Sequence, residues 1–559
     1  MKIFSFVKRS IVVLWHRHHL IVPPKYWGRY YKSFKRKIAF KTECLNPFKL
    51  KEYNMWLDNL NKDEEIMLDY KPLISFIIPV YNIESNFLSD CINSILKQSY
   101  QNFEICIADD HSTNEDTIKT LREYEKKDSR IKVVYRKENG HISKATNSAL
   151  EIASGDYIAL MDDDDKLSED ALYKVALEIN KNRKVDFIYS DEDKEDMNGN
   201  LCEPHFKSDF AKYSFYGGNY ICHFTVIKKS LFDKVGGFRS EYVGAQDFDL
   251  FLRCTEIAEK ICHIPEILYH WRKVPGSTAD TIENKEYAIL NGKKAVEDAL
   301  KREGLDGYVT TPLKVTHYVV HFNLKDKPLV SVIMLDSKRC INNNIKEIDK
   351  LKYKNIEIIT SDYKNINKDI KNSKGEYILI VSGKIRIDNP DLLSEMLGYA
   401  SQKDVGVVGP KIYEFGKLIK SAGLILNNEN IYIDAFNGYF TDSYGFYGRL
   451  IVPYNYSALS DVFMMFNRNK YDEVGGFRED MNFLLSSIDF NLKLLKKYQN
   501  VLLSHLYVCQ KDYKRSERYE LLDEEKDIIR KEYQLDCDTY YNKNLNETYS
   551  FMLKVKKDE

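Results

Sequence analysis

The sequence predicts an α/β protein made of two tandem domains, each built around a mostly parallel sheet. Three observations support this prediction. Short apolar runs alternate with helical segments from residue 72 onward, which is typical of a doubly wound sheet. Four consecutive carboxylates, at residues 162–165, end one of the expected strands. The framework of the first half recurs in the second, and 559 residues are too many for one core.

Composition and charge exclude some classes of function. The formal net charge of −1 argues against a nucleic-acid-binding protein, because such proteins carry a basic surface. The ten cysteines form no C-x-x-C pair, and several lie in apolar runs, where buried reduced thiols are common. No stretch has the roughly 18 apolar residues that span a bilayer, and no signal-peptide pattern is present. We therefore expect a cytoplasmic protein.

Residues 1–42 form a basic arm that contains eleven Lys or Arg residues and no Asp or Glu. Aromatic residues, including Trp15 and Trp27, are interleaved with the basic ones. A basic, aromatic segment suits an anionic membrane surface, so we expect peripheral association with the inner face of the cell membrane. The alternatives are a solvated tail and a docking arm for a partner protein.

The elements of the first half can be predicted in order. A polar, helical connector is expected over residues 43–71. The following elements are expected: strand 72–82 running into a loop, helix 87–98, strand 103–108, helix 115–127, strand 131–135, loop 138–143, helix 144–153 and strand 157–161. Alternating strands and helices of this kind form a parallel sheet with right-handed crossovers.

Carboxylates follow two of these strands, at residues 109–110 and 162–165. Ligands of open α/β sheets bind beyond the carboxyl ends of the strands. Four adjacent like charges are unfavourable unless a cation neutralises them, and hard divalent ions take oxygen ligands. We therefore expect a nucleotide to lie across this edge with a metal ion on its diphosphate. The alternative is a solvated acidic turn.

Motifs over residues 72–280 resemble glycosyltransferase family two, which has the Rossmann-like GT-A fold. They are PVYN at 79–82, ADDHS at 108–112, NGHIS at 139–143, MDDDD at 161–165, YSDEDK at 189–194, VGGFR at 235–239, GAQDFDL at 244–250, LYHWR at 268–272 and GSTA at 276–279. The similarity is greatest to bacterial enzymes that assemble O-antigen, capsule or rhamnan-type polysaccharides. It implies a catalytic GT-A domain over residues 72–310.

The resemblance also implies the roles of individual residues. It assigns nucleotide-sugar binding to Pro79, Tyr81, Glu84, Asp110, Asp162 and Asp163, binding of Mn²⁺ or Mg²⁺ to Asp162, Asp164, Asp165 and His270, and general base catalysis to Asp247. Asp162 and Asp164 form the Asp-x-Asp pair that would hold the metal against the donor diphosphate. Asp247 would deprotonate the acceptor hydroxyl, which gives a single displacement with inversion.

Several of these residues have a second interpretation. Asp249 is an alternative base, or a residue that only caps a helix. His270 is alternatively a core histidine beside Trp271. An acidic loop over residues 191–193 is expected near the acceptor, with a solvated turn as its alternative. Asp109 has the simpler role of orienting Asp110.

The second half repeats the framework of the first but not its chemistry. GEYILIV at 375–381 repeats GDYIALM at 155–161, and VGGFR recurs at 474–478. The positions equivalent to Asp162, Asp163, Asp164, Asp165, Asp110, Tyr81 and Asn82 hold Ser382, Gly383, Lys384, Ile385, Tyr363, Ser337 and Lys338. Asp489 alone persists, at the position of Asp247.

We therefore expect a degenerate GT-A-like domain over residues 328–510 that serves acceptor binding, lid formation or self-association. A lysine at the second position of the Asp-x-Asp motif would repel a divalent cation. The alternative is a metal-independent second transferase in which Lys384 compensates the diphosphate charge. A helical extension is expected over residues 511–559.

Together these observations predict a metal-dependent inverting glycosyltransferase. Its partners would be a nucleotide-diphosphate sugar donor and a glycan or lipid-linked glycan acceptor, and we expect no nucleic-acid partner. One rival is a nucleotidyltransferase that makes the sugar nucleotide, although residues 79–85 lack the Gly-rich phosphate loop typical of that class. The other rival is a non-enzymatic scaffold for glycan assembly.

Overall fold

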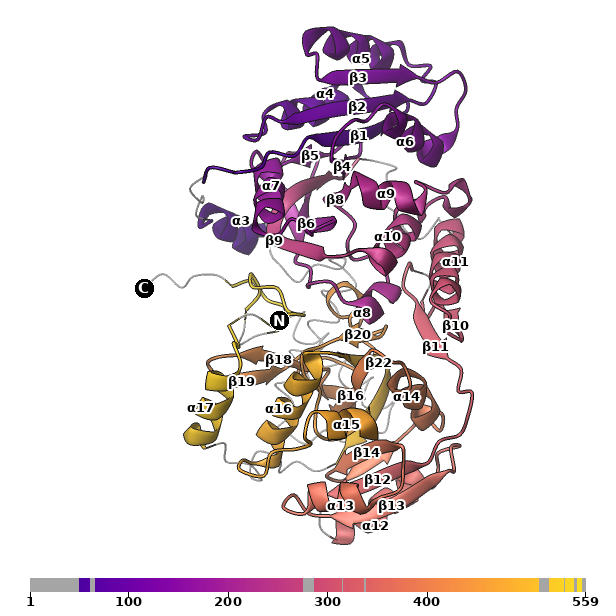
Figure 1. Ribbon diagram of the computed structural model, residues 1–559, viewed down its shortest axis with the longest axis vertical. Coiled ribbons are helices and arrows are strands. Elements are labelled where there is room, and N and C mark those ends of the chain that lie inside the picture. Colours follow the sequence, from indigo (N-terminus) through magenta and orange to yellow (C-terminus); the bar gives the residue numbers. More distant parts are fainter. Residues whose placement is uncertain are drawn as a thin grey trace, which may run out of the picture. The chain divides into compact units, whose positions relative to one another are not determined.

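The protein forms two compact units (Figure 1). The computed structural model describes residues 50–60, 66–274, 286–313, 315–335, 338–511, 522–536, 538–546 and 550–554. The first unit contains residues 46–323, 452–455 and 536–559, and the second contains residues 324–451 and 456–535. The basic arm predicted at residues 1–42 lies outside the described residues.

The first four strands of the first unit are parallel, as the sequence predicts. They are β1 (Ile74–Val80), β2 (Phe103–Asp109), β3 (Ile131–Tyr135) and β4 (Tyr157–Leu160), connected by helices α4 (Ser85–Leu96), α5 (Glu115–Lys127) and α6 (His141–Glu151). Their order in the sheet is β3-β2-β1-β4. Because β2 and β4 both pair in parallel with β1, the residues that follow all three strands lie at the same edge.

The sheet becomes mixed beyond β4. The remaining strands are β5 (Lys166–Leu167), β6 (Phe187–Glu195), β7 (Leu201–His205), β8 (Thr225–Lys228) and β9 (Ile261–Arg272). Strand β8 runs antiparallel to β4 and to β6, whereas β9 runs parallel to β6. Residues 191–193 lie within β6, so the prediction of an acidic loop there is wrong.

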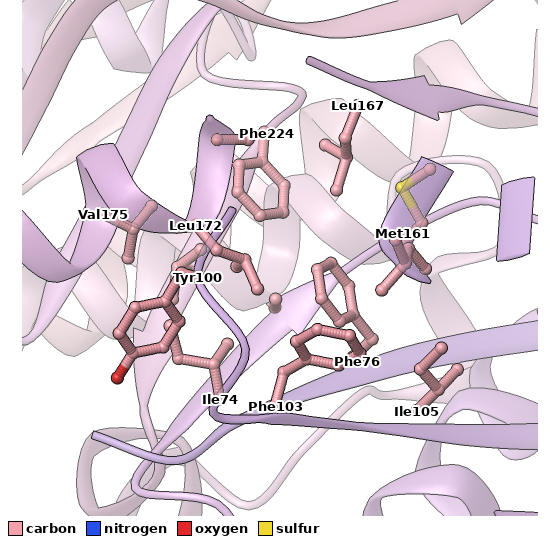
Figure 2. Close-up of a cluster of buried hydrophobic side chains, with 14 of the residues drawn as sticks. Ile74, Phe76, Tyr100, Phe103, Ile105, Met161, Leu167, Leu172, Val175 and Phe224 are labelled. Carbon is pink, nitrogen blue, oxygen red and sulfur yellow. The ribbon is translucent and has the colours of Figure 1, made fainter. Parts of the chain in front are cut away.

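Further helices and a hairpin complete the first unit. They are α3 (Leu50–Asp58), α7 (Ala171–Lys181), α8 (Lys212–Tyr216), α9 (Lys229–Val235), α10 (Gln246–Ile257), α11 (Glu286–Arg302), β10 (Gly307–Thr310) and β11 (Val319–Phe322). Figure 2 shows part of the buried hydrophobic core of this unit, where Phe76 packs edge-on against Phe103 and stacks on Phe224. Burial of such aromatic rings contributes strongly to stability, so this core fixes β1, β2 and the start of β8.

The second unit repeats the strand order of the first. Its sheet strands are β12 (Val330–Leu335), β13 (Ile356–Ser361), β14 (Tyr377–Ser382), β15 (Ile385–Ile387), β16 (Val405–Glu414), β17 (Leu418–Ser421), β21 (Phe463–Asn467) and β22 (Gln499–Gln510). The order β13-β12-β14-β21-β16-β22-β15 matches β2-β1-β4-β8-β6-β9-β5. Parallel and antiparallel pairings also match, strand for strand.

Helices surround this second sheet as well. They are α12 (Lys338–Ile348), α13 (Ile366–Asn372), α14 (Leu392–Ala400), α15 (Arg468–Glu473), α16 (Phe483–Leu495) and α17 (Asp523–Glu532). The predicted helical extension over 511–559 is therefore helical at α17, whereas residues 538–546 and 550–554 form turns and belong to the first unit. In the part of the chain that the structure describes, no helix is long and apolar enough to cross a membrane.

Candidate active site

The acidic motifs meet at the edge where β1, β2 and β4 end. Tyr81 directly follows β1 and its side chain is 52% exposed. Glu84 stands at the N-cap of α4, and Pro79 lies in β1 beside Ala108 of β2. Asp110 follows β2, and its backbone N–H donates to the carbonyl of Val80 at 2.8 Å. The residues expected to contact a nucleotide therefore share this edge.

Asp110 is buried and is held by two donors. Its carboxylate accepts hydrogen bonds from the N–H of Gly140 at 2.9 Å and from Nε of Arg136 at 2.8 Å. A Cβ at Gly140 would lie only 2.6 Å from Arg136 Nη2, so the contact favours glycine. Asp109 accepts from the Ser112 N–H at 3.3 Å, on the same turn. Asp110 thus fixes the start of α6 against the end of β2.

Residues 162–165 form a cluster of like charges between β4 and β5. Burial, together with the charge of Asp162, raises the pKa of Asp164 to about 6. Burial and the neighbouring carboxylates also raise the pKa of Asp163 and of Asp165 well above the ordinary range. A divalent cation would remove this repulsion, so the carboxylates of the cluster fit a metal ion.

The members of the cluster differ in exposure and in partners. The Asp162 side chain is 41% exposed. Asp165 is fully buried and accepts from the hydroxyl of Tyr269 at 2.5 Å and from the N–H of Arg272 at 2.7 Å. Both Asp165 oxygens already have donors, whereas the exposed Asp162 side chain is accessible to a cation from solution.

His223 is a further member of the site that the sequence analysis missed. Its Nε2 lies 3.7 Å from Oδ2 of Asp162, and its ring stacks on Tyr269 with 4.7 Å between centroids. Ligand atoms of Asp162, Asp165 and His223 all lie within 4.8 Å of one another. Nothing in the local sequence indicates this, because His223 stands in an apolar run just before β8.

His270, the histidine that the sequence analysis proposed, has a different environment. Its Nδ1 lies 2.6 Å from Oδ1 of Asp193, whose Oδ2 accepts from the hydroxyl of Tyr53 at 2.6 Å. Among the described residues, it is His223 and not His270 that groups with Asp162 and Asp165 at ligand distance. Metal binding by His270 stays a prediction.

Asp247, the candidate base, is the second residue of α10. Its Oδ2 accepts from Nδ2 of Asn219 at 3.0 Å, and its Oδ1 accepts from the N–H of Phe248 at 2.8 Å. Burial raises the pKa of Asp247; a hydrogen bond from Phe248 and the charge of His223 oppose this shift, whereas the charge of Asp162 adds to it. A carboxylate with a raised pKa is suited to general base catalysis.

Asp249, the alternative base, forms buried ion pairs with Arg239 and Arg253. Its side chain is fully buried and accepts from Nε of Arg239 at 3.0 Å and from Nη2 of Arg253 at 2.8 Å. Both of its oxygens are therefore taken by guanidinium groups. This geometry makes Asp249 a structural residue of α10 and leaves Asp247 as the carboxylate of the motif that faces the cluster.

The acidic residues at positions 191–193 of β6 also have partners inside the protein. Asp191 is fully buried and accepts from Nδ2 of Asn542 at 2.7 Å, and Glu192 lies 3.3 Å from Nζ of Lys207. Asp193 accepts from the buried Tyr53, so each of the three carboxylates has a buried partner, and the partners of Asp191 and Asp193 are far away in the sequence. Those partners explain why residues 191–193 form a strand and not an exposed loop.

The second unit has no carboxylate cluster at the equivalent described positions. Asn344 ties down the turn between β14 and β15, because it bonds the carbonyl of Gly383 at 2.8 Å and the N–H of Ile385 at 3.1 Å. Asp489 is fully buried in the middle of α16, 2.7 Å from Nζ of Lys493 and 2.8 Å from the hydroxyl of Tyr533. Ser337 lies outside the described residues.

Comparison with known proteins gives the class of the first unit. Residues 75–236 match the family described as Glycosyl transferase family 2. The "Uncharacterized glycosyltransferase MJ1057" of Methanocaldococcus jannaschii is 30% identical over 207 residues, which cover 36% of this chain and 71% of that protein. The chain belongs to glycosyl transferase family 2.

Two longer relatives match most of the chain. The "Uncharacterized protein y4gI" of Sinorhizobium fredii is 35% identical over 472 residues, which cover 77% of this chain and 52% of that protein. The "O-antigen biosynthesis protein RfbC" of Myxococcus xanthus is 26% identical over 474 residues, which cover 76% of this chain and 36% of that protein. The chain thus spans about half or less of the length of these two relatives.

Proposed function

We propose that the first unit is a metal-dependent inverting glycosyltransferase. It transfers a sugar from a nucleotide-diphosphate donor to a hydroxyl group of a growing surface glycan. One observation carries the proposal: Asn219 and His223, four residues apart, contact the two kinds of carboxylate. Asn219 donates to Asp247 at 3.0 Å, and His223 Nε2 lies 3.7 Å from Asp162, so the candidate base and the candidate cation site belong to one site. Family membership supports the same class of reaction.

The donor is assigned to the edge formed by β1, β2 and β4. Pro79, Tyr81, Glu84 and Asp110 contact the base and ribose in this proposal, and Asp162 and Asp163 lie beside the diphosphate and sugar. Asp162 and Asp164 would hold Mn²⁺ or Mg²⁺, with Asp165, His223 and His270 as further candidate ligands. When bound, the cation neutralises the negative charge that develops on the diphosphate as the sugar leaves.

Asp247 is assigned the role of base. It accepts the proton of the acceptor hydroxyl through the oxygen that now accepts from Asn219. Attack by that hydroxyl on the face opposite the leaving group inverts the anomeric carbon, and this route needs no covalent intermediate with the enzyme. Asp249 does not compete for the role, because Arg239 and Arg253 hold its carboxylate.

The proposed acceptor is a surface polysaccharide that is being assembled at the inner face of the cell membrane. The name of the Myxococcus relative refers to O-antigen biosynthesis, which supports a lipid-linked or polymeric glycan acceptor. The basic arm, residues 1–42, would supply peripheral membrane contact in the cytoplasm. The second unit would then be a non-catalytic module, since its turn at 382–385 carries no carboxylate.

A donor screen tests the proposal. Purified full-length protein with Mn²⁺ is incubated with uridine-, thymidine- and guanosine-diphosphate sugars, with and without glycan acceptors, and nucleotide release is measured. We expect release from one donor, loss of release with EDTA, and an inverted anomeric configuration in the product. EDTA-resistant turnover would contradict metal dependence, and a retained configuration would contradict single displacement.

A further inference from the structure

One short loop contacts both halves of the proposed site. In the 219–223 loop, which precedes β8, Asn219 donates from Nδ2 to the Asp247 carboxylate at 3.0 Å. Four residues later, His223 places its Nε2 3.7 Å from the Asp162 carboxylate. The conformation of this loop therefore sets how the candidate base and the candidate metal ligands are placed relative to each other.

A buried ion pair, Lys207 and Glu192, forms hydrogen bonds with the backbone at the end of this loop. Lys207 has no side-chain exposure, and its Nζ donates to the carbonyl of Ile221 at 2.5 Å and also to the carbonyl of His223. Glu192 lies 3.3 Å from Nζ of Lys207 and accepts from the N–H of His223 at 3.0 Å. The two polar backbone groups of His223 are thus bound by the two members of one ion pair.

The C-terminal segment, residues 538–546, completes this arrangement. Asn542 is buried and donates from Nδ2 to the carbonyl of Lys207 at 2.8 Å and to the carboxylate of Asp191 at 2.7 Å. The backbone carbonyl of Thr539 accepts from the N–H of Asp209 at 3.2 Å. Residues more than 300 positions along the chain therefore fix the backbone from the carbonyl of Lys207 to the N–H of Asp209.

We propose that Lys207 and Glu192 are positioning residues that hold the 219–223 loop, and that Asn542 completes this device from the C-terminal segment. The inference rests on the proposed function of the first unit. Neither member of the pair touches the carboxylate cluster directly; both act through the placement of His223 and Asn219.

The chemistry of the pair supports a positioning role. A buried ion pair can often be replaced by neutral groups of similar size without loss of stability, so stability alone is a weak reason for having one. The three donors of a lysine ammonium instead fix three acceptors at once, here two carbonyls and a carboxylate. Partners that orient metal ligands in this way typically change metal affinity or activity about 10- to 100-fold when they are removed.

The test uses the full-length protein and two changes of different severity. Lys207→Met combined with Glu192→Gln removes both charges together and leaves no unpaired buried ion. Asn542→Ala keeps the ion pair of Lys207 and Glu192 and removes the hydrogen bonds that Asn542 donates to the Lys207 carbonyl and to Asp191. Asn544→Ala is the matched control, because Asn544 lies in the same segment but donates to the carbonyl of Pro265. Thermal melting of all variants measures folding separately.

Mn²⁺ binding, followed by the EPR signal of the free ion, and the kcat and KM of sugar transfer are the readouts. We expect the double variant to raise the half-saturating Mn²⁺ concentration and to lower kcat, each at least about tenfold. Asn542→Ala should shift both in the same direction by a smaller factor, and Asn544→Ala should shift neither. Values within about twofold of wild type in the folded double variant would overturn the inference.

The proposed function fails in a distinguishable way. If wild-type protein binds Mn²⁺ but transfers no sugar, the function is wrong and the EPR comparison still decides the positioning role. If wild-type protein binds no Mn²⁺, both proposals are overturned.

Discussion

The two sheets of this protein share a framework and differ at the edge where the first one carries its acidic cluster. In the first unit, Ser75 Oγ donates to Glu104 at 2.6 Å and accepts from the N–H of Gly155 at 2.8 Å. In the second, Ser331 Oγ donates to Glu357 at 2.6 Å and accepts from the N–H of Gly375 at 2.7 Å. The hydrogen bonds that connect β1 with β2 and the start of β4 therefore recur between β12, β13 and the start of β14.

A second duplicated contact joins parts of each unit that are distant in sequence. Asn147 donates to the carbonyl of Phe238 at 2.9 Å, and Asn367 donates to the carbonyl of Phe477 at 2.8 Å. In contrast to this framework, carboxylates in one unit are replaced by Ser382, Gly383 and Lys384 in the other. The residues that hold the framework differ from those that carry the acidic cluster, so the framework can be kept while the cluster is lost.

The largest expected effect on the rate of sugar transfer distinguishes the turn at residues 162–165 from the equivalent turn at residues 382–385. Asp164→Asn should lower the rate of sugar transfer on the order of a thousandfold, because it removes a proposed ligand of the charge-neutralising cation. Lys384→Ala, at the equivalent position of the second unit, should leave the rate unchanged. Steady-state kinetics with saturating Mn²⁺ measures both. Loss of activity in Lys384→Ala would mean that the second unit takes part in the chemistry.

Asp247 of α10 and Asp489 of α16, which the repeated sequence motif aligns, give the next comparison. Asp247→Asn should lower kcat by about 10²- to 10⁴-fold with little change in melting temperature, because it removes the base. Asp489→Asn should leave kcat unchanged and lower the melting temperature, because it weakens the ion pair between residue 489 and Lys493. A kcat that survives in Asp247→Asn would contradict the assigned base, and Asp249→Asn would then be the variant to measure.

The like charges of the cluster predict a pH dependence that the second unit lacks. The pKa of Asp164 is raised to about 6, so protons compete with the metal as the pH falls through 6, and apparent Mn²⁺ affinity should drop there. An ordinary aspartate would lose the ion only near pH 4.

The same shift predicts the sign of the effect on stability. A carboxyl group with a raised pKa in the folded state favours folding when it is protonated, so metal-free protein should gain stability between pH 7 and pH 5. Melting curves with EDTA should show this gain in wild type and a smaller one in Asp164→Asn. Equal gains in both would show that other groups cause it.

The smallest expected effect tests the shared framework. Ser75→Ala should lower the free energy of unfolding by about 1–3 kcal/mol, because it removes the acceptor of the buried Gly155 N–H. Ser331→Ala should cost less, because the Gly375 N–H also donates to Oε1 of Glu357 at 3.1 Å. Chemical denaturation of the two variants measures this cost. An equal or larger cost for Ser331→Ala would show that Glu357 does not compensate for the lost serine acceptor.

The sequence predicts the framework well because local patterns determine it. The expected helix over 115–127 and strand over 131–135 agree with α5 and β3, and the acidic residues that follow β2 and β4 lie at one edge as expected. The apolar runs and their turn residues carry this information within a few positions of each element.

What the sequence misses depends on partners far away in the chain. Asp191 and Asp193 are predicted to be in a loop because acidic residues disfavour strands, yet Asn542 and Tyr53 satisfy them inside β6. His223 shows no motif, since its importance comes from its contact with Asp162 and from the grip of a buried ion pair. Long-range contacts of this kind leave no local pattern.

The most direct test of a single active site is the number of donor sites per chain. Isothermal titration calorimetry of full-length protein with a nucleoside diphosphate, in the presence of Mn²⁺, measures this number. We predict one site, abolished by Asp162→Asn and unaffected by Lys384→Ala. Two sites, or one site that survives Asp162→Asn, would contradict the assignment of the chemistry to the first unit alone.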